Sequence, residues 1–263
     1  MLTTPYPDTI QALLSGYSST GENLQTSSQA EVYFFQHPTK PSLFVKQLNP
    51  KNAPREADLY AEKIALEWLQ GKLSVPRLMG YERAGDLEYM VTVRIPGWPA
   101  SEHEAKKDIP RLVRLLAKGL QEIHALSFDD CPLDRRVDAG LESVEQLFEN
   151  GYIDLQNFPE AIRKRTLQST LDAIRQLQPT HEDVVFTHGD YCLPNILVED
   201  GHLTGFIDLG YAGLADRYRD FISADYSIRR NLGAEWVPVF LDAYGIEIDA
   251  EKFAFYQLLH DLI

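Results

Sequence analysis

The stretch THGDYCLPNILVEDGHLTGFIDLG, residues 187–210, contains two short apolar runs, at Ile196–Val198 and Leu203–Ile207, separated by a turn sequence. The turn, residues 199–202, reads EDGH, and an Asp-Gly pair between apolar runs is a strong signal for a β-hairpin. We therefore predict a loop, a strand, a tight turn, a second strand and another loop. Pairing of the two strands would bring the two flanking loops side by side.

Polar residues in these loops have the spacing of a phosphoryl-transfer site. Asp190 is followed five positions later by Asn195, and Asp208 opens an Asp-Leu-Gly sequence, as in the catalytic and metal-binding loops of kinases. In that interpretation Asp190 accepts the proton of the attacking hydroxyl group, while Asn195 and Asp208 hold Mg²⁺ against a triphosphate. The alternative is an ordinary hairpin whose acidic residues cap neighbouring loops. The joint spacing favours the kinase interpretation, with His188 fixing the loop by a hydrogen bond rather than acting in catalysis.

The first ninety residues carry the alternation of apolar and polar residues that is typical of strands. Runs at Glu31–Phe35, Ser42–Leu48 and Leu87–Val93 predict an antiparallel sheet. Between the second and third runs, apolar residues at helical spacing predict a helix over Glu56–Gln70, ended by Gly71. The expected order is strands, one helix and a further strand.

Two residues of this first part have the positions that phosphoryl transfer requires. Lys46 lies on the second predicted strand and Glu62 on the following helix, and a kinase uses a strand lysine on the phosphates and a helix acid to position it. Without the motif in the second half of the chain, Lys46 would be interpreted as an exposed strand residue and Glu62 as part of the polar face of an amphipathic helix. The loop QTSSQA at 25–30 contains no glycine, so its backbone amides, with Ser28 as a candidate side chain, would have to contact the phosphates.

The pattern changes to helices after residue 95. The cluster IPGWP at 95–99 is the predicted hinge, because proline and glycine interrupt both strands and helices. We therefore expect an α+β chain with an N-terminal lobe at 1–94, a hinge at 95–99 and a mainly helical C-terminal lobe at 100–263. Helices of the second lobe are predicted at Asp108–Ile123, Leu141–Asn150, Pro159–Gln178, Glu235–Tyr244 and Asp249–Leu262, with a strand at Val184–Phe186.

Bulk composition indicates a globular protein outside the membrane. With 263 residues, 44% of them hydrophobic, the chain can bury a core, and its apolar runs are far shorter than the roughly 20 residues that span a bilayer. The N-terminus lacks the basic start and apolar stretch of a secretory signal. The only two cysteines, Cys131 and Cys192, are too few for a disulfide framework. We expect a cytoplasmic protein in which both thiols are structural.

The formal charge is −14, from 39 acidic residues and 25 lysines and arginines. This excess repels phosphate backbones and so argues against a nucleic-acid partner. It fits a cationic partner, although an acidic surface also simply keeps a protein in solution.

In its longer motifs the chain resembles the aminoglycoside 3'-phosphotransferases. The similarity is carried by FTHGDYCLPNILV at 186–198 and GFIDLGYAGLADRYRD at 205–220, with weaker matches at 67–76, 121–126 and 256–263. The resemblance implies a protein-kinase-like fold of two lobes that uses ATP or GTP with Mg²⁺. It also implies phosphorylation of the 3'-hydroxyl of kanamycin- or neomycin-type aminoglycosides, and hence antibiotic resistance. The acidic surface would then serve a polycationic substrate.

The same resemblance assigns further roles by position. Phe44, which alone would pass for a core strand residue, would stack on the purine, and backbone groups of Val93 and Ile95 in the hinge would contact the purine edge. The ammonium groups of the substrate would be bound by Asp154, Asn157, Glu160, Asp261 and the terminal carboxylate of Ile263.

Four positions depart from the pattern of this family. Arg230, Asn231 and His260 stand where relatives usually carry acids, and Tyr211 stands where some carry arginine. An arginine, and a histidine when it is charged, weaken the attraction for a polyamine. A kinase of another small hydroxylated molecule, such as a macrolide, an amino alcohol or a glycated amine, is therefore an alternative. A third interpretation is a nucleotide-binding pseudokinase scaffold, which the intact set of catalytic residues disfavours.

Overall fold

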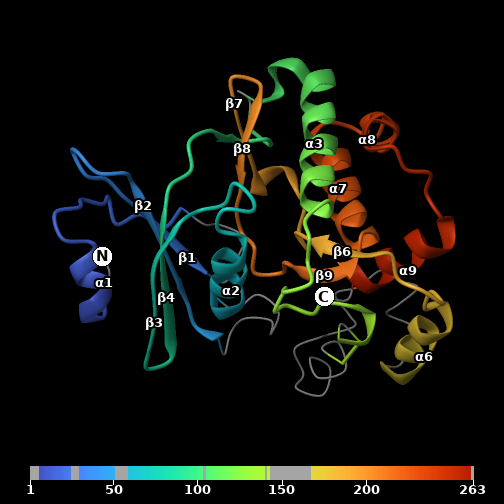
Figure 1. Ribbon diagram of the computed structural model, residues 1–263, viewed down its shortest axis with the longest axis horizontal. Coiled ribbons are helices and arrows are strands. Elements are labelled where there is room, and N and C mark those ends of the chain that lie inside the picture. Colours follow the sequence, from blue (N-terminus) through green and yellow to red (C-terminus); the bar gives the residue numbers. More distant parts are fainter. Residues whose placement is uncertain are drawn as a thin grey trace.

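The computed structural model describes residues 6–24, 30–50, 59–102, 105–139, 141–142 and 167–261. They form two lobes, a four-stranded antiparallel sheet with its helices and a larger, mainly helical part (Figure 1). The helix α2, Leu59–Leu69, lies between the sheet and the larger part. This arrangement confirms the predicted α+β class. Within the described ranges, no helix is long and apolar enough to cross a membrane.

The N-terminal sheet has the strand order β1-β2-β4-β3, and all its pairs are antiparallel. The sequence does not predict β3, because LMGYERA carries a glycine and charged residues without regular alternation. The strands are β1 Glu31–Phe35, β2 Leu43–Leu48, β3 Leu78–Ala84 and β4 Leu87–Val93.

The two faces of this sheet pack against different helices. On one face Val45 and its neighbours form a separate apolar cluster with α1, Asp8–Leu13, a helix that the sequence pattern does not predict. On the other face Leu48 and Met90 join the core that includes α2. Because side chains alternate along a strand, Lys46 lies on this second face, toward α2.

The larger part consists of helices around two short sheets, β5-β7-β8 and β6-β9. The predicted cap of α3 is confirmed, because the Asp108 carboxylate accepts a hydrogen bond from the Arg111 amide at 3.0 Å. The elements are β5 Trp98–Pro99, a 3-10 turn Ala105–Asp108, α3 Ile109–His124, α6 Leu167–Leu177, β6 Val184–Thr187, a 3-10 turn Leu193–Asn195, β7 Ile196–Glu199, β8 His202–Phe206, β9 Gly213–Asp216, α7 Tyr218–Asn231, α8 Trp236–Tyr244 and α9 Ala250–His260.

Most of the predicted helices of this part are confirmed. The helices α3, α8 and α9 lie where the apolar pattern places them, and α6 is the described end of the helix predicted at 159–178. The helix predicted at 141–150 lies almost wholly outside the described residues. Neither β9 nor α7 is predicted by the apolar pattern, because the arginines, aspartates and serines of α7 interrupt the apolar stripe.

The hairpin predicted from the Asp-Gly pair is present as β7 and β8. Asp200 has φ of 50° and Gly201 has φ of 72°, the left-handed conformation that a two-residue hairpin turn requires at both positions. The strand β5 pairs with β7 and so attaches the end of the predicted hinge to the hairpin. The hairpin tip is tied to α3, since Arg111 Nη2 donates to the Gly201 carbonyl at 2.9 Å.

A buried ion pair attaches the last helix. Lys252 Nζ of α9 lies 2.8 Å from Asp216 Oδ2, and the Asp216 side chain is fully buried. The same carboxylate accepts hydrogen bonds from the Asp183 and Tyr218 amides, at 2.8 and 3.0 Å. The Asp216 carboxylate thus connects α9 to the start of β6 and to the start of α7.

A stacked aromatic pair joins α2 to the larger part. The Trp68 ring of α2 stacks on Phe186 of β6, with centroids 4.7 Å apart. The Trp68 indole N–H donates to Asp130 at 3.0 Å, and Lys72 Nζ lies 3.8 Å from the indole centroid. These contacts fix α2 relative to β6, which leads directly into the loop beginning at residue 188.

Replacing Trp68 with alanine removes the stacked pair and the hydrogen bond to Asp130. We expect a loss of about 2 kcal/mol in the free energy of unfolding, because Trp68 is only half-buried and a fully buried tryptophan costs roughly 3–5 kcal/mol. Tyr60→Ala, on the exposed side of the same helix, is the control and is expected to cost about 0.5 kcal/mol or less. Urea unfolding measures both, and equal losses would contradict the role given to Trp68.

Candidate active site

Lys46 lies between two carboxylates that come from different lobes. Its Nζ lies 2.8 and 2.7 Å from the two Glu62 oxygens on α2, and 2.9 Å from Asp208 Oδ1 in the loop after β8. The Glu62 side chain is 5% exposed, whereas that of Asp208 is 45% exposed. The structure therefore brings together three of the residues that the sequence predicts for phosphoryl transfer.

The charges in this cluster shift one another's titration. Burial raises the pKa of Glu62, and the Lys46 charge opposes that effect. The Lys46 charge also holds the pKa of Asp208 below its ordinary value. For Lys46 itself burial lowers the pKa, but the carboxylates of Asp208 and Glu62 outweigh this and raise it. At neutral pH Lys46 is thus a fixed cation and Asp208 a fixed anion.

Phe44 lies on the same face of β2 as Lys46, two residues before it. Phe44 is opposite Phe34 in the strand register, and the two ring centroids are 5.1 Å apart. Of the two backbone positions predicted to contact the purine edge, Val93 ends β4, and its amide donates to the Arg77 carbonyl at 2.9 Å. In the described part of the chain, no hydrogen bond uses the Ile95 amide, which leaves that N–H available to a ligand.

The Asn195 side chain orients the Asp190 carboxylate. Its Nδ2 donates to Asp190 Oδ2 at 2.9 Å and to the Asp190 carbonyl at 3.1 Å. The Ile207 amide donates to the Asn195 carbonyl at 2.9 Å and so holds the residue before Asp208 against this loop. Among the described residues no donor contacts Asn195 Oδ1. That atom and the outer Asp208 oxygen are the hard donors that Mg²⁺ prefers.

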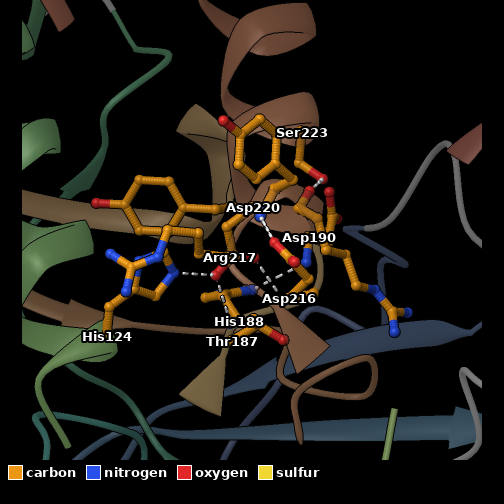
Figure 2. Close-up of polar contacts among 12 residues, drawn as sticks. His124, Thr187, His188, Asp190, Asp216, Arg217, Asp220 and Ser223 are labelled. Carbon is orange, nitrogen blue, oxygen red and sulfur yellow. Dashed lines mark hydrogen bonds and ion pairs between the residues drawn. The ribbon is translucent and has the colours of Figure 1, made fainter. Parts of the chain in front are cut away.

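The buried carboxylate of Asp220 anchors the backbone of the loop at 188–195, which carries Asp190 and is called the catalytic loop below. It accepts hydrogen bonds from the amides of His188 and Gly189, at 2.9 and 2.8 Å, and lies 3.0 Å from the His124 ring (Figure 2). Burial alone would raise the pKa of Asp220, but the hydrogen bonds from the His124 ring and the His188 amide hold it below its ordinary value. The loop is therefore fixed through its backbone by an ionised carboxylate.

His188 has the structural role expected from the sequence. Its Nε2 lies 3.1 Å from the Ile207 carbonyl, and its Nδ1 lies 3.4 Å from the Asp190 amide. The ring thus connects the loop of Asp190 to the strand end before Asp208.

Gly189 allows the catalytic loop to approach the loop that follows Asp208. Its φ is 82°, and a Cβ at this position would lie 2.1 Å from the Tyr211 carbonyl oxygen. No side chain fits at that distance. Asp208 also has a left-handed φ, of 62°, which residues other than glycine rarely adopt outside functional sites and turns.

Sequence reasoning gave no role to Asp220 or His124. The available signal was that Asp220 shares a helical face with residues that are small or apolar, such as Ala224 and Ser227, which indicates a buried acid. A buried acid requires partners, and His124 at the end of the apolar α3 stripe was a candidate.

A cavity of about 260 Å³ opens beside Asp190. Two of the positions that depart from the family pattern, Tyr211 and His260, line it, and so do the guanidinium-bearing side chains of Arg135 and Arg219. Desolvation at the cavity wall lowers the pKa of His260, an effect that the carboxylates of Asp190 and Asp261 oppose. The direction of this shift disfavours the like charge considered from the sequence.

The other described residues that the sequence places on the acceptor side do not line this cavity. Asp261 accepts a hydrogen bond from the Tyr226 hydroxyl at 2.8 Å, and the Tyr226 ring stacks on His260. Arg230 is exposed, and Asn231 donates to the Ser227 carbonyl of its own helix. The predicted residues Ser28, Asp154, Asn157, Glu160 and Ile263 lie outside the described residues.

Both cysteines are free and half-buried. Burial and the Asp190 charge raise the pKa of the Cys192 thiol, and burial raises that of Cys131. Neither sulfur is a thiolate at neutral pH, which agrees with the structural role expected for both.

Known phosphotransferases are similar to this chain over most of its length. The model of the phosphotransferase enzyme family matches residues 23–256. The aminoglycoside 3'-phosphotransferase of Niallia circulans is 33% identical over 199 residues, covering 75% of this chain and 76% of that protein. The aminoglycoside 3'-phosphotransferase of Enterococcus faecalis is 32% identical over 225 residues, covering 84% and 85%.

Solved structures show the same fold. The crystal structure of an aminoglycoside-3'-phosphotransferase of type VIII matches with a TM-score of 0.82 at 27% identity, over 97% of this chain and 98% of that one. The aminoglycoside phosphotransferase APH(3'')-Id from Streptomyces rimosus, in complex with ADP and streptomycin, matches with a TM-score of 0.70 at 22% identity, over 96% and 98%.

Gly189→Ala tests the close approach of the two loops. Gly85→Ala is a matched control, because Gly85 also has a positive φ, of 61°, but open space around it. We expect Gly85→Ala to cost roughly 1 kcal/mol of unfolding free energy, from the left-handed backbone alone, and Gly189→Ala to cost more than about 2 kcal/mol. Thermal unfolding of both variants checks this, and similar losses would show that Tyr211 can move away without cost.

Asp220→Asn removes the charge that anchors the catalytic loop. We expect a loss of about 3 kcal/mol in unfolding free energy at pH 7, against little change for Asp242→Asn on the exposed side of α8. Because the folded pKa of Asp220 is depressed, its contribution is present above the ordinary aspartate pKa of about 3.9 and is lost as the pH falls through the folded value. Urea unfolding as a function of pH measures the difference in unfolding free energy between the wild type and Asp220→Asn. If Asp220 were neutral in the folded protein, this difference would not become smaller at acidic pH.

Proposed function

This chain belongs to the phosphotransferase enzyme family, among the aminoglycoside 3'-phosphotransferases, and we propose that it transfers the terminal phosphoryl group of a nucleoside triphosphate to the 3'-hydroxyl of an aminoglycoside. One observation carries the proposal: the Asp190 carboxylate, oriented by Asn195, lies at the wall of a cavity. The identity of about a third of the residues to enzymes named for this reaction supports the choice of acceptor.

Phosphoryl transfer requires positioning and charge neutralisation more than covalent chemistry by the protein. Asp190 accepts the proton of the acceptor hydroxyl as its oxygen attacks in line, and the Asn195 N–H holds the carboxylate in position. Lys46, kept protonated by its two carboxylate partners, contacts the nucleotide phosphates. Asn195 and Asp208 would hold Mg²⁺, which when bound neutralises charge on the transferred and leaving phosphates.

The nucleotide, ATP or GTP, is proposed to bind on the Lys46 face of the N-terminal sheet. Phe44 on that face supplies an aromatic ring for the purine, and the Ile95 amide supplies a donor for its edge. We accordingly propose that residues 1–94 form the nucleotide lobe, 95–99 the hinge, and 100–263 the lobe that carries the loops and the acceptor. The bound ADP of the Streptomyces rimosus structure is consistent with this use of the fold.

The acceptor is proposed to be a cationic aminoglycoside, because the chain carries a net charge of −14 and Asp261 directly follows His260, which lines the cavity. Asp154, Asn157, Glu160 and the carboxylate of Ile263 complete the proposed set. Phosphorylation within the cell would confer resistance to the antibiotic.

A second acceptor class is favoured by one observation. Arg135 and Arg219 line the cavity beside Asp190, and guanidinium groups repel ammonium groups. A smaller hydroxylated acceptor with fewer amines, such as a macrolide or an amino alcohol, would avoid that repulsion. The active-site chemistry is the same for both classes.

Asp190→Ala decides whether Asp190 is the base. With ATP, Mg²⁺ and kanamycin we expect wild-type turnover to give a product carrying phosphate at the 3' position, seen by mass spectrometry and NMR. The variant should lose turnover by about a hundredfold or more while nucleotide binding, measured by calorimetry, is retained. Chelation of the metal should also stop turnover.

Asp200→Asn in the hairpin turn is the control, since asparagine tolerates the left-handed backbone there. Near-normal turnover by Asp190→Ala would contradict its role as the base. Turnover of a macrolide or amino alcohol, with none on several 3'-hydroxyl aminoglycosides, would replace the proposed acceptor by the second class.

A further inference from the structure

A chain of hydrogen bonds through three residues outside the catalytic loop, Arg217, Tyr244 and His124, ends at the Asp220 carboxylate. Arg217 Nη1 donates to the Tyr244 hydroxyl at 2.9 Å, that hydroxyl lies 2.8 Å from His124 Nδ1, and His124 Nε2 lies 3.0 Å from Asp220 Oδ2. His124 and Tyr244 are the last residues of α3 and α8, and Arg217 immediately precedes α7. The ends of α3 and α8 and the start of α7 are thus joined by one chain of hydrogen bonds (Figure 2 shows its His124 and Asp220 end).

The chemistry of the groups fixes the direction of every proton in the chain. A guanidinium only donates, so the Tyr244 oxygen accepts from Arg217. Burial raises the pKa of Tyr244, so its hydroxyl keeps its proton, and among the described residues the one acceptor within reach is His124 Nδ1. An ionised carboxylate only accepts, so His124 Nε2 carries a proton. In this arrangement His124 donates from Nε2 to Asp220 and accepts at Nδ1 from the Tyr244 hydroxyl.

We propose that Tyr244 and Arg217 are positioning residues of the phosphoryl transfer, which act through His124 and Asp220 on the backbone of the loop that carries Asp190. The inference rests on the proposed function, since it assigns these residues to that reaction. Successive hydrogen bonds that point the same way polarise one another, so the Arg217 cation makes the Tyr244 hydroxyl and then the His124 N–H better donors. The Asp220 oxygens are thereby fixed for the amides of His188 and Gly189.

Arg217 also fixes the other end of the strand that leads to this loop. Its Nη2 donates to Asp183 Oδ1 at 3.0 Å, and Asp183 immediately precedes β6. The end of β6 is followed by His188, whose amide is bound by Asp220 in the first turn of α7. The first turn of α7 and the residue before it thus hold both ends of a four-residue strand, which restricts movement of Asp190 along the strand axis.

Tyr244→Phe isolates the hydroxyl, because the ring retains its edge-to-face contact with Phe221 at 4.8 Å. We expect kcat to fall about five- to tenfold, which is the effect of one hydrogen bond, with the KM for nucleotide changed less than about twofold. Gln121→Met is the matched control, since it removes a 2.9 Å hydrogen bond to the Tyr244 carbonyl and leaves the chain intact. A kcat within twofold of wild type for Tyr244→Phe, or equal falls in both variants, would overturn the proposal.

A conservative variant of Arg217 and a double variant distinguish a positioning role from a general loss of stability. Arg217→Lys retains a cationic donor and should retain more of kcat than Arg217→Met. The double variant Tyr244→Phe with Arg217→Met should be less than about twofold slower than the slower single variant, because both changes break one chain. Independent, multiplying losses would contradict the shared chain.

The tautomer of His124 tests the chain without any turnover. Nitrogen-15 NMR of the imidazole, assigned with His124→Gln, should show a proton on Nε2 and an unprotonated, hydrogen-bond-accepting Nδ1. A ring protonated on Nδ1, or on both nitrogens, would overturn the inference even if the wild-type protein phosphorylates kanamycin. If the predicted tautomer is observed but no aminoglycoside is phosphorylated, the proposed acceptor is wrong. The hydrogen-bond chain from Arg217 to Asp220 is then still supported.

Discussion

The shared ammonium group of Lys46 is the interaction on which the rest of the site depends. One cation between Glu62 and Asp208 leaves an excess of one negative charge at a place where two lobes meet. A buried glutamate without a cation would be costly, and Asp208 needs a fixed position to present its outer oxygen. The alternation of β2 places Lys46 on the correct face, the Trp68 stack on Phe186 fixes α2, and the hairpin fixes Asp208.

The parts of the site that could be predicted from the sequence are those encoded by local spacing. Asp190, Asn195 and Asp208 lie within one hairpin and its flanking loops, so a turn signal and the two intervals between them were enough to place them. Lys46 and Glu62 followed because strand and helix periodicity carry them to adjoining faces. The strand β3 and the helix α7 were not predicted, because charged and small residues interrupt their apolar periodicity. Tertiary contacts rather than intrinsic propensity stabilise both elements.

The support behind the catalytic loop could not be predicted for a different reason. His124 and Asp220 are 96 residues apart in sequence, and Tyr244 is a further 24 residues beyond Asp220. No local sequence pattern predicts this contact. A pattern can indicate that an acid is buried and needs partners, but it does not indicate which residues those partners are. The acceptor side is similar: Arg135, Tyr211 and His260 come from three separate segments and converge only in the folded chain.

The helix α7 faces two different demands along its length. Its first turn carries Asp220, whose carboxylate holds the amides of the catalytic loop, whereas its last turn carries the exposed Arg230. Between these two ends, the Ser227 hydroxyl accepts a hydrogen bond from the Leu193 amide at 2.9 Å, so α7 holds the same loop at a second point. A substitution at Arg230, on the exposed side, leaves both attachments in place. The inner face of one helix therefore fixes the geometry of the loop, while its outer face is open to substitution.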